Sequence, residues 1–241
     1  MDPAVVAIIG LCVVLVLWYG GGYLYNRRRG QRLFSWLEAG LDALGGEREA
    51  GWLGSPASGA RINVIHATAP FRRLEITLLL ENREILPLWL FDRLRSKRDW
   101  LIIKATLRSP RRGEVEIVPT QGQTARTLRK EQAQPWTWYE GPDDLAIAHR
   151  GPGTQSQVAR LEHWLETYSQ HLHRFSWRKT DPHVQVQVSV VGLLATPSQT
   201  FLTDLQATIA GTTHVNKRYS SHVGDDRQSP DWRDSSVTPG A

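Results

Sequence analysis

The stretch HVQVQVSVV, residues 183–191, alternates apolar and polar side chains almost without interruption. Alternation with period two is typical of a β-strand, because successive side chains of a strand point to opposite faces of the sheet. The pattern therefore predicts a sheet with one buried face, whose other face is exposed to water or to a partner. The buried set is Val184, Val186, Val188 and Val190, and the polar set is Gln185, Gln187 and Ser189.

Earlier stretches of the chain show similar alternation and are joined by short turns. Ala69-Pro70 separates the first two expected strands, SPRRG at 109–113 the next two, and residues 141–144 the last two. Gly113 can supply the positive φ that a tight hairpin turn requires. Consecutive strands with short connections favour a largely antiparallel sheet. The expected strands are 61–68, 72–80, 99–108, 114–118, 136–140 and 145–149.

Two helices are predicted in the C-terminal half of the chain. Residues 155–174 carry an apolar stripe at three-and-four spacing, and residues 197–210 begin with Pro197, a favoured first helical residue. Each helix follows a pattern typical of a capping box. The stripe comprises Val158, Leu161, Trp164, Leu165, Tyr168 and Leu172, and the capping pairs are Thr154 with Gln157 and Thr196 with Gln199.

The remaining stretches of the soluble part lack a clear period. Pro87 disfavours a central strand over residues 85–95, so a short helix or a covering loop is expected there. Residues 120–134 are polar and rich in Gln, which predicts a loop. Residues 45–60 are rich in Gly, Ser and Ala and are expected to form a linker.

The N-terminus contains the longest apolar segment, AVVAIIGLCVVLVLWYGGGYLY at residues 4–25, in which no residue is charged. As a helix it extends about 33 Å, enough for a hydrocarbon core of about 30 Å. A cleaved signal peptide is disfavoured, because Asp2 precedes the segment without any Lys or Arg, and arginines follow it. The segment is therefore predicted to be a transmembrane anchor, with Gly20-Gly21-Gly22 weakening its last turns.

Basic residues flank this segment on one side only. Arg27, Arg28, Arg29 and Arg32 follow it, whereas Asp2 and the free amine precede it. Cytoplasmic flanks carry the excess of Lys and Arg, so the N-terminus is expected outside and the C-terminal domain in the cytoplasm. We expect a single-pass protein of the plasma membrane. Arg outnumbers Lys 24 to 5, which favours a prokaryote with a GC-rich genome.

The predicted fold class is α+β: one N-terminal transmembrane helix, then a largely antiparallel sheet domain with two C-terminal-half helices packed on it. Residues 31–45 read as an amphipathic helix, which lies either on the membrane or against the domain; its two acidic residues favour the domain. The expected units are a transmembrane anchor at 1–26, a basic juxtamembrane stretch with helix and linker at 27–60, a cytoplasmic domain at 61–210 and a disordered tail at 211–241.

Familiar catalytic patterns are absent from the sequence. It contains no phosphate-binding glycine loop, no G-x-S-x-G and no H-E-x-x-H, and its one cysteine lies in the apolar segment. Neither a cofactor nor a metal site is expected, since the histidines lack a recognisable ligand spacing and the paired acids lack a partner that would separate their pKa values. The groups considered are His163, His171, His173 and His183, Asp143-Asp144 and Asp225-Asp226.

Positive charge is concentrated in the first half of the expected domain. Residues 61–134 contain 15 Lys and Arg against 8 Asp and Glu. In a domain anchored beside the inner leaflet, such residues would contact anionic lipid headgroups or form a solvated face. Nucleic acid is disfavoured as a partner, because no recognised nucleic-acid module is present. The residues expected at an anionic surface are Arg93, Arg95, Lys97, Arg98, Arg111 and Arg112.

Trp136 and Trp138 form the second candidate surface. Strand alternation places both side chains on one face, where they are either core residues or a platform for a ligand or partner. The sequence as a whole favours a non-enzymatic, membrane-anchored binding or scaffolding module. The alternatives are a structural subunit of a larger membrane complex with a protein partner, and an enzyme with an unfamiliar site around His149, Asp143 and these tryptophans. No motif identifies a family.

Overall fold

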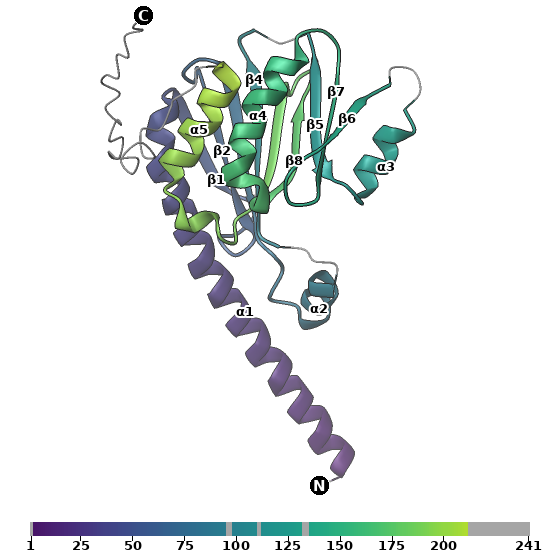
Figure 1. The fold of residues 1–241 in the computed structure, drawn as a ribbon. Helices are drawn as coiled ribbons and strands as arrows, with labels where there is room; N and C mark the ends of the chain where they lie inside the picture. Colours follow the sequence, from purple (N-terminus) through teal and green to yellow (C-terminus); the bar gives the residue numbers. More distant parts are fainter. Residues whose placement is uncertain (1, 95–97, 110–111, 132–134, 212–241) are drawn as a thin grey trace, which may run out of the picture.

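A computed structural model of the chain describes residues 2–94, 98–109, 112–131 and 135–211. A long N-terminal helix leads into a nine-stranded sheet in which every pairing is antiparallel (Figure 1). The strand order is β1-β2-β3-β4-β9-β8-β5-β7-β6. The α+β class and the antiparallel sheet are therefore confirmed.

The described elements are α1 Pro3–Leu41, η1 Asp42–Leu44, β1 Glu47–Trp52, β2 Gly59–Ile65, β3 Phe71–Leu79, α2 Leu86–Leu94, β4 Trp100–Leu107, β5 Glu114–Pro119, α3 Gln123–Arg129, β6 Thr137–Glu140, β7 Leu145–Arg150, α4 Thr154–Tyr168, η2 Ser169–His171, β8 Leu172–Trp177, β9 Val184–Ser189, η3 Leu193–Ala195 and α5 Ser198–Ala210.

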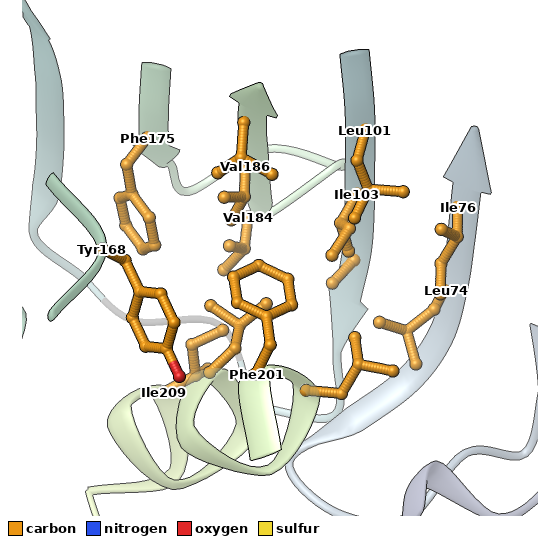
Figure 2. Close-up of a cluster of buried hydrophobic side chains, with 14 of the residues drawn as sticks. Leu74, Ile76, Leu101, Ile103, Tyr168, Phe175, Val184, Val186, Phe201 and Ile209 are labelled. Carbon is orange, nitrogen blue, oxygen red and sulfur yellow. The ribbon is translucent and has the colours of Figure 1, made fainter. Parts of the chain in front are cut away.

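The main core lies between one face of the sheet and the helices α1, α4 and α5 (Figure 1). Val184, Val186 and Val188 of β9 are buried there, as their alternation predicts. Figure 2 shows Phe201 of α5 pointing toward β9, while Tyr168 of α4 points toward α5, where its hydroxyl donates to Asp204. The polar side chains of β9 lie on the opposite face and remain partly exposed. We call this opposite face the open face of the sheet.

Helix α1 is continuous, so the anchor and the amphipathic helix expected at 31–45 form one element. The three consecutive glycines do not interrupt it, because helical backbone hydrogen bonding continues through them. Its C-terminal part packs on the sheet domain through Leu33, Leu37 and Leu41, and Leu44 of η1 extends this contact. Of the two placements considered for residues 31–45, the structure has the packed one.

The expected linker at 45–60 and the expected domain start at 61 need correction. Residues 47–52 form the edge strand β1, and β2 begins at Gly59. Every residue of β1 is exposed, so the strand is held through backbone pairing with β2. An edge strand with no buried face has no apolar alternation, which is why composition alone suggested a linker.

The hairpin expected between residues 99–108 and 114–118 is wrong, although both stretches are strands. β4 pairs with β3 and β9, whereas β5 pairs with β7 and β8. The two strands therefore lie in different parts of the sheet. Short connections usually join neighbours, but pairing is decided by which strand completes each buried face.

The helix expected at 155–174 also differs, because α4 ends at Tyr168 and Leu172–Trp177 form strand β8. Leu172 happens to lie four residues after Tyr168, at helical spacing, so the sequence pattern did not reveal the transition from helix to strand. The loop expected at 120–134 includes helix α3. Neither expected capping box forms: Gly153 and Pro197 occupy the N-cap positions of α4 and α5, without side-chain caps. The tail from residue 212 lies outside the described residues.

Candidate functional site

One face of α1 meets the sheet domain where the exposed apolar part of the helix ends. Trp18, Gly22 and Asn26 are four residues apart, a spacing that places side chains on the same side of a helix. They meet the segment that follows β3. We call this contact the α1 junction, and its residues are Trp18, Gly22, Asn26, Arg29, Glu81, Arg83 and Asp99.

Backbone groups make much of this contact. The Trp18 indole N–H donates to the Arg83 carbonyl at 3.1 Å, and the Asn26 side-chain amide donates to the Glu81 carbonyl at 2.8 Å. A Cβ at Gly22 would overlap the Arg83 carbonyl oxygen, so glycine is what permits the close approach. The junction therefore fixes both the rotation and the height of α1 relative to the sheet.

Asp99 lies at the centre of the α1 junction with no exposed side-chain surface. Its carboxylate accepts hydrogen bonds from the Arg29 Nε at 2.5 Å, the Arg83 Nη1 at 2.9 Å and the Glu81 amide at 2.9 Å. Arg83 also donates to Asn26 Oδ1 and to Glu81 Oε2. A buried carboxylate needs such partners, because an unpaired buried charge is strongly unfavourable.

The surroundings of Asp99 favour its ionised form. Burial alone would raise the pKa of its carboxyl, but the hydrogen bonds from Arg83, the Glu81 amide and Arg29 outweigh burial and hold this pKa below its usual range. The charge is therefore retained at neutral pH. Since the carboxylate is shared among three donors, it holds elements together and is poorly placed to act as a general base.

Arg29 thus differs from the other arginines predicted to flank the apolar segment. Arg27, Arg28 and Arg32 are exposed, while the guanidinium of Arg29 is turned inward to Asp99. Sequence reasoning grouped all four together. The distinguishing signal is the phase of the helix, since only Arg29 shares a face with Asn26 and Leu33.

Helix α2 lies beside α1 next to the junction (Figure 1). The ring centroids of Trp18 and Trp89 are 5.3 Å apart. None of the residues of α2 is buried, although most of them are apolar. This is the short helix that the sequence left as one of two choices for residues 85–95.

The structure separates the basic residues expected at an anionic surface. Arg93 is an exposed residue of α2, and Arg98 is half-buried just before β4. Arg112 is exposed beyond the other end of β4, about 26 Å away along an eight-residue strand. These residues therefore belong to two sites. Arg95, Lys97 and Arg111 lie outside the described residues.

Trp136 and Trp138 share one face of the sheet, as predicted, and cations cover both. The guanidinium of Arg150 lies 4.2 Å from the Trp136 ring centroid, and that of Arg129 lies 5.0 Å from the Trp138 centroid. Trp136 is 8% exposed and packs with Leu128 of α3. The core alternative therefore describes Trp136, whereas Trp138 lies at the edge of that small cluster.

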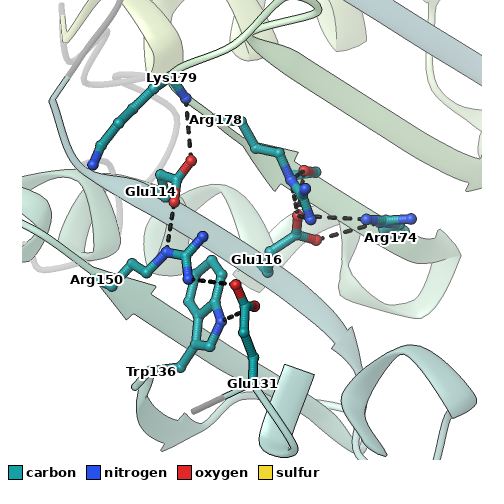
Figure 3. A network of polar contacts seen from close by, with 9 residues as sticks. Glu114, Glu116, Glu131, Trp136, Arg150, Arg174, Arg178 and Lys179 are labelled. Carbon is teal, nitrogen blue, oxygen red and sulfur yellow. Dashed lines mark hydrogen bonds and ion pairs between the residues drawn. The ribbon is translucent and has the colours of Figure 1, made fainter. Parts of the chain in front are cut away.

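Sequence reasoning missed a network of carboxylates and arginines on the open face (Figure 3). Glu116 of β5 has no exposed side-chain surface and accepts from Arg174, Arg178 and Ser176. Glu114 pairs with Arg150 at 2.6 Å, which extends the network to Glu131. The available signal was EVEIV itself, in which two glutamates alternate with apolar residues in a strand. Because each described carboxylate is matched by an arginine, the network stabilises pairing of β5, β7 and β8.

The residues considered for an unfamiliar enzyme do not converge. His149 faces the helices, where its Nδ1 lies 2.7 Å from the Thr154 hydroxyl and its ring stacks on Tyr139. Burial lowers the pKa of His149. The two tryptophans project from the other face of the hairpin, since they alternate with the residues facing the helices. Asp143 accepts instead from the Ser169 hydroxyl at 2.6 Å.

The histidines considered as metal ligands lie in different surroundings. His163 pairs with Glu166 on the exposed side of α4, His173 contacts the Trp100 ring at a tilt of 49°, and His183 accepts from the Leu107 amide. Across the described ranges, no group of three His, Cys, Asp or Glu side chains is placed to hold a metal ion. Asp225 and Asp226 lie outside those ranges.

No family model and no curated protein matches this chain. The α1 junction, with α2 beside it, is the site best defined by geometry, because buried charge, close backbone approach and exposed apolar surface meet there.

Proposed function

We propose that the protein is a single-pass protein of the plasma membrane whose α1 anchors a non-enzymatic binding or scaffolding domain at the cytoplasmic surface. The observation that carries the proposal is the continuity of α1 from an exposed apolar segment into the domain core. The α1 junction supports it, since Asp99 clamps the helix at the point where it leaves the sheet. The domain would then be held in one orientation relative to the bilayer.

The N-terminal half of α1 supports a membrane span. It is the one helix among the described residues that is long and apolar enough to cross a membrane, and its most apolar window has none of its residues buried. A cleaved signal sequence would share that composition. Cleavage after the apolar segment, however, would remove Trp18 and Gly22 from their contacts with Arg83, and therefore part of the domain's own packing.

The proposed orientation rests on exposed arginines. Arg27, Arg28 and Arg32 follow the apolar segment directly and are exposed, which is the distribution typical of a cytoplasmic flank. Anionic headgroups of the inner leaflet are proposed partners for them. Arg29 contributes to orientation in a different way, through its ion pair with Asp99.

Binding is proposed in place of catalysis because the open face offers a broad polar surface. A shallow depression there is lined by Glu75 and Lys104, which pair at 3.5 Å, and by Thr106, which donates to Asp181. Mixed charges at modest depth suit contact with a protein partner better than enclosure of a small substrate. A protein partner in a membrane complex is therefore part of the proposal.

Cysteine mapping tests the topology. Cys12 is the only cysteine, so a Cys12→Ala background accepts single cysteines at Asp2 and at exposed Ser156 of α4. An impermeant maleimide should label Asp2→Cys in intact cells and Ser156→Cys only after the membrane is opened. Labelling of Ser156→Cys in intact cells would contradict the orientation, and recovery of a soluble, shortened chain would contradict the anchor.

Reversing the charge of the exposed arginines that follow the apolar segment tests the proposed orientation against a control with the same change in net charge. Replacing Arg27, Arg28 and Arg32 with Glu should invert or abolish insertion, because the basic flank is lost. Arg29 is retained so that the ion pair with Asp99 stays intact. The control has the same charge change at three exposed arginines of the sheet domain, Arg72, Arg73 and Arg126.

A further inference from the structure

Helix α2 exposes an unusual amount of apolar side chain for its length. It has nine residues, LPLWLFDRL, and Leu88, Leu90 and Phe91 are 47–53% exposed. Leu94 at its C-terminal end is 78% exposed. A surface helix in water normally buries one apolar stripe against its own domain. Trp89 contacts the Trp18 ring of α1, and the other apolar side chains named here remain about half exposed or more.

A short helix with so much exposed apolar surface requires another apolar surface to pack against it. Helices shorter than about 12–15 residues are marginal in water, and proteins stabilise them mainly by packing an apolar face. The segment preceding α2 is held firmly by Arg83. The Arg83 carbonyl accepts a hydrogen bond from the Trp18 indole, and the Arg83 guanidinium binds the Asp99 carboxylate. The α1 junction therefore positions the helix, while Leu88, Leu90, Phe91 and Leu94 remain 47–78% exposed.

The length of α1 gives the depth at which α2 lies. The exposed part of α1 before its first contact with the domain, Pro3–Leu17, is 15 residues long and extends about 22 Å. A hydrocarbon core of about 30 Å requires about 20 residues. A membrane-spanning α1 therefore keeps Trp18 and the following turn at bilayer level. Because Trp89 contacts Trp18, α2 lies at that level too.

Other features on this side of the molecule agree with that depth. Val191 and Leu194, which follow β9 beside the first residue of β4, are 51% and 42% exposed. Tyr25 and Trp18 of α1 are aromatic residues of the kind that prefer the headgroup layer. Arg93 is placed in the last turn of α2, where its long side chain can extend to phosphate groups.

We propose that α2 is an interfacial membrane helix. Its leucines and Phe91 insert at the boundary between the hydrocarbon and the headgroups, in the leaflet nearest the sheet domain. The inference rests on the proposed span of α1. The bilayer is the occupant because α2 is continuous with the apolar surface of α1 through the two tryptophans, and because Arg93 lies in the last turn of α2. The protein then contacts the membrane through two elements, which restrict both tilt and rotation of the domain.

Site-directed spin labelling of the full chain tests this placement. In the Cys12→Ala background, nitroxides are attached at Leu88→Cys and, separately, at Phe91→Cys, and the protein is reconstituted in phosphatidylcholine vesicles containing phosphatidylglycerol. Accessibility is measured to oxygen, which concentrates in bilayers, and to a water-soluble nickel complex. Val13→Cys reports the span, and Ile65→Cys is the matched control, an apolar residue 43% exposed at the far end of the sheet.

The expected ratio of oxygen to nickel accessibility at Leu88 and Phe91 is several-fold above that at Ile65 and below that at Val13. A water-like ratio at Leu88 and Phe91, with a membrane-like ratio at Val13, would overturn the inference and leave the proposed anchor standing. Water-like ratios at Val13 as well would overturn the proposed function. Exclusion of both reagents from Leu88 and Phe91 would indicate a second copy of the chain on α2, which also overturns the inference.

Discussion

The Asp99 carboxylate is a main point of attachment between α1 and the sheet domain, because it pairs with Arg29 of α1 and with Arg83. Removing one partner of a buried ion pair leaves the other charge uncompensated, so Asp99→Asn should destabilise the domain by about 3 kcal/mol or more. Denaturant unfolding in detergent measures the effect. Asp42→Asn is the control, because its ion pair with Arg48 is exposed and should contribute about 1 kcal/mol or less. Equal effects of the two changes would contradict the role assigned to Asp99.

The same residue predicts a pH dependence. The folded pKa of Asp99 is held below the value of about 3.9 that the carboxyl has in an unfolded chain. Its stabilisation is therefore complete above the unfolded pKa and is lost as the pH falls through the folded pKa. The difference in unfolding free energy between wild type and Asp99→Asn should be constant above about pH 5 and should narrow in more acidic solution. A difference that stays constant down to about pH 3 would exclude the assignment.

The sequence predicted these residues unevenly. The arginine-rich flank was visible in composition, but the particular role of Arg29 depends on Asp99, which lies 70 positions away. The network around Glu116 was missed for a related reason, since a glutamate in an apolar strand has no partner in its own segment. Ion pairs between residues far apart in the chain cannot be predicted from the local sequence pattern around either residue.

At the scale of elements, α1 and its neighbours depend on glycines that allow close approach. A Cβ at Gly30 would overlap the Pro56 carbonyl oxygen and lie 3.1 Å from a methyl of Leu80, whereas a Cβ at Gly21 meets nothing within 4 Å. Gly30→Ala should therefore lower the unfolding free energy by about 1–3 kcal/mol, as overpacking does. Gly21→Ala should be neutral or should stabilise the helix by up to about 1 kcal/mol.

Thermal unfolding of both variants, followed by circular dichroism, separates these expectations. An unchanged midpoint for Gly30→Ala would mean that α1 can shift away from the loop at Pro56. The close approach would then be incidental to stability.

Elements with one buried and one wet face were those the sequence predicted well. β3, β4 and β9 alternate clearly because each contributes one side to the core. β1 has no buried residue, and β5 is buried on both faces except at its last residue, so neither presents period two in full. β8 was concealed by Leu172, which falls at helical spacing from the stripe of α4. Pairing of β5 with β7 and β8 depends on partners beyond any local turn.

At the scale of the whole molecule, α1 connects an exposed apolar segment to the domain core, and the rotation of the helix fixes how the two parts are oriented relative to each other. An alanine inserted between Arg27 and Arg28 rotates everything before it by about 100° relative to Leu33 and the core. The insertion should therefore break the contacts of Trp18 and Asn26 and lower the thermal midpoint by several degrees. The same insertion after Gly10 should leave the midpoint unchanged, because that part of α1 is exposed. Equal midpoints would show that the two halves of α1 act independently.

If α1 spans the membrane as proposed, a rigid helix clamped to one side of a wide sheet would also couple bilayer thickness to the position of the domain. The nine strands extend about 38 Å from β1 to β6, and α1 packs near the β1 side. Helices adjust to thinner or thicker bilayers partly by tilting. If α1 spans as proposed, a change in tilt of about 10° toward or away from β6 would displace that strand by about 7 Å relative to the lipid surface. The distance between the lipid surface and a partner bound at the β6 edge would then change with membrane thickness.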